Sequence, residues 1–350
     1  MDEFHCELKN GEKMKIKVLT PPIEFEQSMA EKTFWWNDIR DRALKGELER
    51  ENLRVKLFLW ELGGEYLGSV VLLTPKPESD IGLVEFVGTS PEHRNKGVAG
   101  AILDALIKCF EENGGLALYL CTTNPIAYEL YKKKGFASCI GDGMRRITSL
   151  NHEFDEGYLS YTGPPQIRVA EWGDMPRFAP LFNNPHNVFF IKDFILPVFH
   201  DGRYESHFKK MLLPQEKGEG VLLVLENPDR RIVGSCFLKA GSSFYEQHIG
   251  LIDYMIAPDY SGYVGDLLTA ACKKAKELGL EMLLNRGAGC DTQKLAGFKD
   301  AGFKCDTYVK RYYKTENERY DKMISVLELQ QDGASRKTRG EYYGLKPDWL

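Results

Sequence analysis

The chain has 350 residues, of which 43% are hydrophobic and 28% charged, a composition typical of a folded protein with a large core. At roughly 100–200 residues per domain, this length predicts two domains. A net charge of −5 excludes a global field that would hold nucleic acid or an anionic membrane. No apolar run approaches the roughly 18 residues of a membrane-spanning helix, and the acidic N-terminus lacks a signal-peptide pattern. We therefore expect a cytoplasmic protein with neither nucleic-acid nor membrane partners.

The eight cysteines and seven histidines favour reduced thiols and no bound metal. No two cysteines are close enough to form a CxxC pair, and most lie in apolar stretches. His200 and His207 are seven residues apart, but they share a helical face only if the intervening glycine does not break the helix. Oligomeric state cannot be read from these features.

The first half of the chain alternates strands with helices. Leu62, Gly63 and Gly64 separate two β-rich runs and predict a hairpin. Apolar residues then recur with helical spacing from Val98 until the stop signal Asn113-Gly114-Gly115. We expect strands over 55–61, 66–74, 82–89 and 116–121, and helices within 24–50, from 98 to this stop, and from 125 to 134.

The stretch from Ser90 to Gly100 joins the third strand to the following helix and contains Arg94, Gly97 and Ala99. The first N–H groups of a helix have no internal partner and lie at the positive end of the helix dipole, so they can bind phosphate oxygens. Gly97 and Ala99 would let a phosphate approach the backbone. Because many helices begin near glycine for packing reasons alone, this loop by itself leaves both interpretations open.

Two motifs in this half resemble those of the GNAT acetyltransferase superfamily. Arg94, Gly97 and Ala99 fill the places of its acetyl-CoA signature, which is Gln or Arg, two residues, Gly, one residue, then Gly or Ala. About 30 residues downstream, Asn124, Ala127, Leu130-Tyr131 and Gly135-Phe136 resemble its second motif in the right order and spacing. Asn95 stands where the family often has glycine. The resemblance covers roughly residues 14–150 and implies an α/β fold with a mixed (α+β) sheet and acetyl-CoA as co-substrate.

This resemblance also implies roles for particular residues. Backbone groups of Val87 and Thr89 would pair with the pantetheine arm of acetyl-CoA, while Asn124 would contact the cofactor. The Tyr131 hydroxyl would lie near the sulfur and protonate the departing thiolate. The pyrophosphate would be held by backbone N–H groups of Arg94, Asn95, Lys96, Gly97, Val98, Ala99 and Gly100.

The acceptor side is less well defined by the sequence. Phe34, Trp35 and Trp36 fall in the early helical region that lines the acceptor site in the family, although adjacent tryptophans on a helix point in different directions and one is expected in the core. Glu85 is the best candidate base, since strand alternation places it on the face of Val87 and Thr89 unless a bulge intervenes. A salt bridge on a half-solvated strand, or a water chain acting as the base, are the alternatives.

The second half repeats the first. Ile249–Pro258 matches Ile81–Pro91 with one residue fewer before the proline, and a helical stripe from Val264 to Gly279 follows. A strand at 281–284, a helix near 291–300 and Gly302-Phe303 complete the copy. We therefore expect two tandem GNAT folds, divided into a GNAT domain at 1–150, a linker at 151–165, a degenerate repeat at 166–314 and a tail at 315–350 with a helix over 316–329.

The repeat lacks the residues expected to bind the cofactor. Alignment of the two prolines puts Ser261 at Arg94, Val264 at Gly97 and Asp266 at Ala99, and alignment of the Gly-Phe pairs puts Phe298 at Tyr131. A carboxylate at this position would repel a pyrophosphate. The missing residue before Pro258 also predicts that a bulge of the first copy is lost in the second.

We therefore expect an acetyl-CoA-dependent N-acetyltransferase that acts on an amine of a small molecule or on a peptide N-terminus by direct attack in a ternary complex. Two alternatives stay open. The chain could be a CoA-binding sensor or scaffold without turnover, or an acyltransferase that uses a longer acyl donor. The sequence does not identify the acceptor amine.

Overall fold

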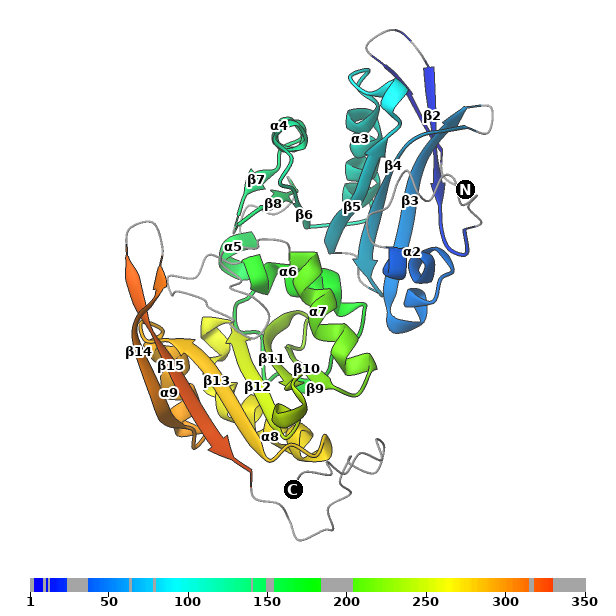
Figure 1. The fold of residues 1–350 in the computed structure, drawn as a ribbon. Coiled ribbons are helices and arrows are strands. Elements are labelled where there is room, and N and C mark those ends of the chain that lie inside the picture. The colour runs from blue at the N-terminus through cyan, green and yellow to red at the C-terminus, as the bar shows by residue number, and fades with distance from the viewer. Residues whose placement is uncertain are drawn as a thin grey trace.

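The computed structural model describes residues 3–8, 11, 13–23, 37–62, 65–77, 80–139, 141–148, 154–183, 204–314 and 318–329. These residues form two mixed β-sheets with associated helices, one sheet in each half of the chain (Figure 1). No helix within these ranges is long and apolar enough to cross a membrane.

The first sheet has the strand order β1-β2-β3-β4-β5-β6-β8-β7. Its strands are β1 (Glu3–Glu7), β2 (Lys13–Leu19), β3 (Leu53–Leu62), β4 (Glu65–Pro75), β5 (Ile81–Thr89), β6 (Ala117–Cys121), β7 (Ala137–Ser138) and β8 (Gly143–Ile147). The helices of this half are α2 (Asn37–Leu44), α3 (Val98–Glu112) and α4 (Pro125–Lys133). The expected hairpin, helix 98–112 and helix 125–134 are confirmed.

The second sheet repeats this topology. Its order β9-β10-β11-β12-β13-β15-β14 reproduces β2-β3-β4-β5-β6-β8-β7, and in each sheet the parallel pair is connected by a helix. The strands are β9 (Gln166–Val169), β10 (Gly220–Glu226), β11 (Ile232–Ala240), β12 (Ile249–Ile256), β13 (Met282–Ala288), β14 (Lys304–Lys314) and β15 (Arg319–Glu328). The helices are α6 (Asp174–Asn183), α7 (Tyr204–Glu216), α8 (Val264–Glu277) and α9 (Thr292–Asp300). The two halves therefore carry the same fold.

Two details differ from the expectations. The helix expected over 316–329 is wrong, because Arg319–Glu328 form β15, which pairs with β13 on one side and β14 on the other. Pairing with two neighbouring strands outweighs the local helical pattern. The second sheet therefore continues past residue 314. In the expected linker, the short helix α5 (Phe154–Gly157) begins with Phe154, which is buried, as is Tyr158.

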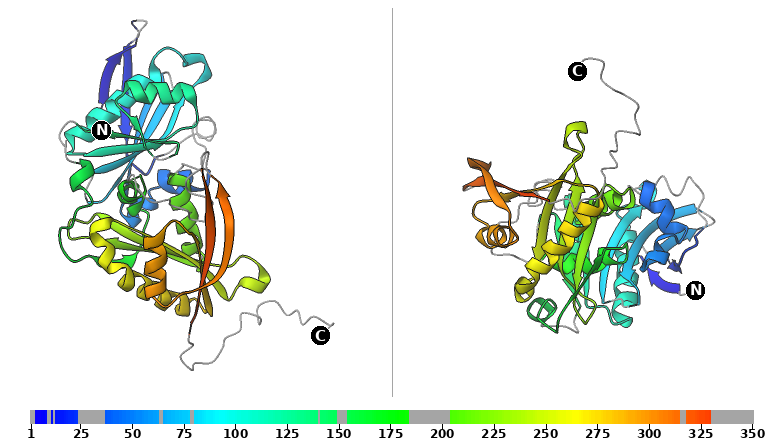
Figure 2. Two further views of the ribbon diagram at one scale, coloured as in Figure 1. Left: turned by 90° about the vertical axis from the view of Figure 1, so that its left-hand side faces the viewer. Right: turned by 90° about the horizontal axis from the view of Figure 1, so that it is seen from below.

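The described residues form three hydrophobic cores. One lies between α3 and the first sheet, and another lies between α8 and the second sheet. The third, which we call the shared core, contains Leu57, Val71 and Leu83 from the first half and Phe178, Phe237 and Met255 from the second. Every residue of α6 is buried, and this helix packs on β4, β5 and β11, between the two sheets (Figures 1 and 2). The two halves are therefore one packed unit.

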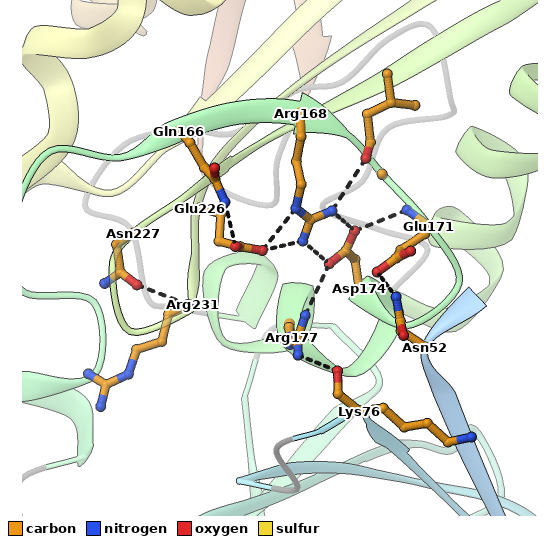
Figure 3. Close-up of polar contacts among 12 residues, drawn as sticks. Asn52, Lys76, Gln166, Arg168, Glu171, Asp174, Arg177, Glu226, Asn227 and Arg231 are labelled. Carbon is orange, nitrogen blue, oxygen red and sulfur yellow. Dashed lines mark hydrogen bonds and ion pairs between the residues drawn. The ribbon is translucent and has the colours of Figure 1, made fainter. Parts of the chain in front are cut away.

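A polar seam closes the joint between the halves at the start of α6 (Figure 3). Arg177 donates from Nη2 to the carbonyl oxygen of Lys76 over 2.8 Å, and Asn52 donates from Nδ2 to Glu171 Oε1 over 2.8 Å. The N–H of Gly173 donates to the carbonyl oxygen of Glu51 over 2.8 Å. A Cβ atom on Gly173 would lie 2.4 Å from the carbonyl oxygen of Asn52, so only glycine allows this approach.

Candidate acetyl-donor site

The two parallel strands at the centre of the first sheet diverge. They pair from Ile81↔Ala117 to Leu83↔Tyr119, and the described residues show no further pairing between them although β5 continues to Thr89. Beyond Tyr119, β6 stays paired with β8. Backbone groups of β5 after Leu83 on the β6 side can therefore bind an extended ligand in the way that a neighbouring strand would.

A β-bulge lies in the diverging part of β5. The register with β4 passes from Ser69↔Gly88 to Val71↔Glu85, so β5 has one extra residue here, and Phe86 has φ +52°. Simple alternation along this strand therefore fails. Glu85 pairs with Val71 and lies on the face of the shared core, whereas Val87 packs on the α3-side core. The expectation that Glu85 and Val87 share a face is wrong because the bulge intervenes.

The loop between β5 and α3 has the features of an anion site. Asn95 (φ +64°) and Gly97 (φ +91°) adopt left-handed conformations, which turn the chain sharply into the helix. Gly97 is the N-cap of α3, no side chain caps this helix, and its first turn contains no acidic residue. The positive end of the dipole is therefore uncompensated. Arg94 is exposed beside this turn, and its Nε donates to the carbonyl oxygen of Thr89 over 3.4 Å.

Helix α4 completes the site on the α3 side. Asn124 is its N-cap and accepts from the N–H groups of Ile126 and Ala127 over 2.9 and 3.4 Å. Tyr131 is 6% exposed and belongs to the α3-side core, against which Val87 also packs. Tyr131 and Val87 thus lie on one face of the sheet and Glu85 on the other. Phe34, Trp35 and Trp36 lie outside the described residues.

Comparison with known proteins identifies the first half. Residues 20–136 match the acetyltransferase (GNAT) family. This part of the chain is a GNAT domain. No curated protein matches the chain.

Many solved structures are similar in fold to part of the chain. One is yncA, a putative acetyltransferase from Salmonella typhimurium with acetyl-CoA, at 15% identity and a TM-score of 0.43 over 50% of this chain and 100% of that one. Another is a phosphinothricin acetyltransferase from Sinorhizobium meliloti in complex with acetyl-CoA, at 14% identity and a TM-score of 0.44 over 54% of this chain and 98% of that one. A ribosomal-protein-alanine N-acetyltransferase from Brucella melitensis shows 16% identity and a TM-score of 0.40 over 47% of this chain and 99% of that one.

The second half does not reproduce the candidate donor site of the first. Its strands β11 and β12 pair without a register shift from Gly234↔Ile256 to Ala240↔Gly250. The predicted loss of the bulge is therefore confirmed. As a consequence, Tyr254 and Met255 face the α8-side core and the shared core, respectively, whereas the aligned Phe86 and Val87 face the opposite ways.

Side chains of the second half fill the space where its central strands diverge. The β12–β13 pairing ends at Leu251↔Leu284. Just beyond it, Asn285 donates from Nδ2 to the carbonyl oxygen of Ile252 over 3.0 Å, and Lys294 Nζ lies 3.0 Å from Asp253 Oδ1. All three side chains are at least 95% buried: Asn285, Lys294 and Asp253. By alignment of the repeats, Lys294 stands where Ala127 stands and Asp253 where Glu85 stands.

The helices of the second half also differ from those of the first at the positions aligned with the expected donor-binding residues. Asp266 lies in the first turn of α8, so a carboxylate occupies the electrostatic position of a bound anion. Phe298, the counterpart of Tyr131, is fully buried with its ring centroid 5.1 Å from that of Tyr254. Burial raises the pKa of Asp291, the N-cap of α9, against the opposing effect of Lys294.

A cavity of about 640 Å³ lies away from the candidate donor site, beside the polar seam between the halves, with which it shares Glu171. Its charged lining includes Arg168 and Glu226, which are bound to each other and, through Arg168, to Asp174. The charges of Arg168 and Glu226 are therefore already paired within the protein. The cysteines are free thiols, and the described part of the chain has no group of three His, Cys, Asp or Glu side chains placed to hold a metal ion.

Sequence reasoning missed two residues that matter to this site. Phe86 forms the bulge, and the only signal for it was the one-residue difference before Pro258. Lys294 fills the second cleft, and extending the alignment of the two Gly-Phe pairs back to Ala127 would have found it.

Proposed function

We propose that the GNAT domain transfers an acetyl group from acetyl-CoA to an amine by direct attack in a ternary complex. The observation that carries this proposal is the contrast between the two copies of one fold. The first copy has a bulged strand β5 and a helix α3 with no carboxylate in its first turn, while the second has a regular β12, a cleft filled by Lys294 and Asp266 in the first turn of α8.

The donor would bind along the diverging strands. Its pyrophosphate would accept from backbone N–H groups between Arg94 and Gly100 at the uncompensated end of α3. Its pantetheine arm would pair with Val87 and Thr89, whose backbone lies in the part of β5 that β6 no longer covers. The exposed side chain of Asn124 lies at the start of α4, on the other side of this gap.

The positions of the side chains support a division of proton transfers between the faces of the sheet. The amine attacks the thioester carbon, and the proton that it loses passes to Glu85 directly or through water. The carbonyl oxygen becomes negative and would be held by the Val87 amide at the bulge. When the C–S bond breaks, Tyr131 donates its proton to the thiolate. The proposed base and acid thus lie on opposite faces of the sheet, so the two side chains do not compete for the same space.

The second half would bind no donor of its own. Its anion position carries Asp266, its cleft is filled by Lys294, and the counterpart of the base is paired with that lysine. We place the GNAT domain at residues 1–150, the linker at 151–165 and the degenerate repeat from 166 to at least the end of β15 at Glu328.

Titration calorimetry with acetyl-CoA tests donor binding, and we expect one molecule bound per chain. Release of free CoA thiol, followed across an amino acid, a polyamine, an aminoglycoside, an aryl amine and a peptide, then tests turnover and acceptor class. Binding without amine-dependent thiol release would favour a sensor, and faster turnover of a longer acyl-CoA would favour another donor. Two bound molecules per chain would contradict the assignment of the second half.

A further inference from the structure

Phe86 combines an unfavourable backbone conformation with a position at the centre of the proposed donor site. Its φ of +52° lies in the left-handed region, which bulky residues rarely adopt. Such conformations persist only where the surrounding structure holds them. The bulge of β5 therefore needs a support outside its own backbone.

The support for Phe86 comes from the joint between the two halves. Its side chain is half-buried and packs against the shared core, on the face of the sheet opposite α3. Helix α6, from the second half, lies along this face and packs on both β4 and β5. All ten residues of α6 are buried, so the helix has little freedom to move away.

The aligned residue of the second half shows what happens without the bulge. Tyr254 has an ordinary strand conformation, and its ring faces the α8-side core of its own half against Phe298. Because of the bulge, Phe86 packs against the shared core, whereas the aligned Tyr254 packs in the core of its own half. This reversal occurs only in the copy that keeps the phosphate loop.

We propose that Phe86 is a positioning residue whose ring, anchored in the shared core, holds the bulge of β5 in the shape that aims the Val87 amide at the acetyl carbonyl. The second half, without a donor site of its own, thereby supports the donor site of the first. This inference rests on the proposed function, since it assumes that the bulge meets the acetyl group of acetyl-CoA.

The test compares binding of acetyl-CoA with binding of S-ethyl-CoA, a thioether of similar shape that lacks the carbonyl oxygen. In the unaltered chain, we expect acetyl-CoA to bind about fivefold more tightly, as one hydrogen bond to the carbonyl would give. Phe86→Gly tolerates positive φ but removes the anchor. We expect it to abolish the preference for acetyl-CoA while the affinity for S-ethyl-CoA changes less than twofold. With an accepted amine, kcat should fall about 10- to 100-fold, while KM for acetyl-CoA should rise by no more than about fivefold, the amount that the lost preference requires.

Two further variants keep the test decisive. Phe86→Leu retains an apolar anchor and should recover part of the preference and of kcat, and it decides the matter if Phe86→Gly does not fold. Tyr254→Leu alters the aligned residue of the second half and should leave both ligands bound as in the unaltered chain.

Failure of the inference and failure of the proposed function give different results. An unaltered chain that binds neither ligand contradicts the proposed function. An unaltered chain that binds both equally, or Phe86 variants that keep its preference and kcat, overturns the positioning role.

Discussion

Ala127 and Lys294 occupy the same place in the two copies of the fold, and their difference in size and charge changes what each cleft can hold. The methyl group of Ala127 is too short to reach across the gap between β5 and β6. The long side chain of Lys294 reaches the gap between β12 and β13 and neutralises Asp253 there. Because a buried carboxylate is costly without a partner, removing either the lysine or the aspartate alone would destabilise the second half.

Tyr131→Phe tests the proposed acid. The substitution removes a hydroxyl from a side chain that is 6% exposed and keeps the ring in the α3-side core. We expect amine-dependent thiol release to fall about 100-fold, because general acid catalysis contributes at least this much. Affinity for acetyl-CoA should change little, which calorimetry would show.

Tyr128→Phe is the matched control for this experiment. Tyr128 lies on the same helix, and its hydroxyl contacts Ser138 Oγ at 2.9 Å, on the exposed side. It should leave thiol release unchanged. Equal rates for Tyr131→Phe and the unaltered chain would remove Tyr131 from the mechanism.

Some residues of the site could be predicted because their signals are local. Arg94, Gly97 and Ala99 lie within residues 94–99, and together with the second motif from Asn124 to Phe136 their spacing predicts a donor-binding loop. The position of Glu85 could not be predicted, because the face on which it lies depends on an extra residue in β5. The one-residue difference before Pro258 predicts a bulge, but only the register with β4 places it between Glu85 and Gly88.

At the scale of the element, α3 and α8 begin alike but differ in the charge of their first turn. Both begin without a side-chain cap, but only α8 carries a carboxylate in its first turn, at Asp266. A fixed negative charge compensates the dipole and repels a phosphate at the same time.

Ala99→Asp places that carboxylate at the corresponding position of α3. We expect acetyl-CoA affinity to fall at least about tenfold, since one charge repelling the pyrophosphate at close range costs over about 1.4 kcal/mol. Added salt should reduce the difference from the unaltered chain. Calorimetry at two salt concentrations measures both effects.

Lys108→Gln provides the control for Ala99→Asp. It makes the same change of one unit in net charge at the other end of α3, where the Lys108 and Glu112 side chains are 66% and 60% exposed. Affinity for acetyl-CoA should not change. A similar loss in both variants would point to the net charge of the chain as the cause.

Another element, the short strand β9, is tied to α6 by charge. Arg168 donates to both oxygens of Asp174 over 2.6 Å and also to Glu226 (Figure 3). Burial acts to raise the pKa of Glu226, but the hydrogen bonds and charge of Arg168 outweigh it and hold this pKa below its ordinary value. A carboxyl whose pKa is lowered by folding stabilises the fold above its unfolded pKa and loses this contribution as pH falls.

Glu226→Gln should therefore lower the free energy of unfolding by about 1.5–3 kcal/mol at neutral pH, the range for hydrogen bonds to a charged group. The difference from the unaltered chain should stay constant above about pH 5 and shrink below the ordinary glutamate pKa of about 4.3. Urea unfolding at pH 7 and pH 3.5 measures this. A difference that grows on acidification would show that the Glu226 pKa is raised.

At the scale of the whole molecule, the joint between the halves is the part that no local pattern predicts. Length and the repeat predict two folds in one chain, but not that α6 of the second lies against β4 and β5 of the first. That arrangement depends on contacts between residues about 100 positions apart, such as Arg177 with Lys76. The same packing includes part of the expected linker, since Phe154 and Tyr158 belong to the shared core.

A fragment of residues 1–165 should consequently not fold as a stable monomer. Val71 and Leu73 of β4 and Ile81 and Leu83 of β5 face the shared core and are at least 95% buried. Exposing such side chains costs about 1.5–3 kcal/mol each. For these four the cost is comparable to the whole stability of a typical domain, about 5–15 kcal/mol.

We expect this fragment to aggregate or to lack cooperative thermal unfolding, as size-exclusion chromatography and circular dichroism would show. Expressed together with residues 166–350, it should recover a folded complex and acetyl-CoA binding, because α6 would again cover β4 and β5. A monomeric fragment that unfolds cooperatively and binds acetyl-CoA as tightly as the full chain would show that the GNAT domain stands alone. The second half would then be dispensable for the donor site.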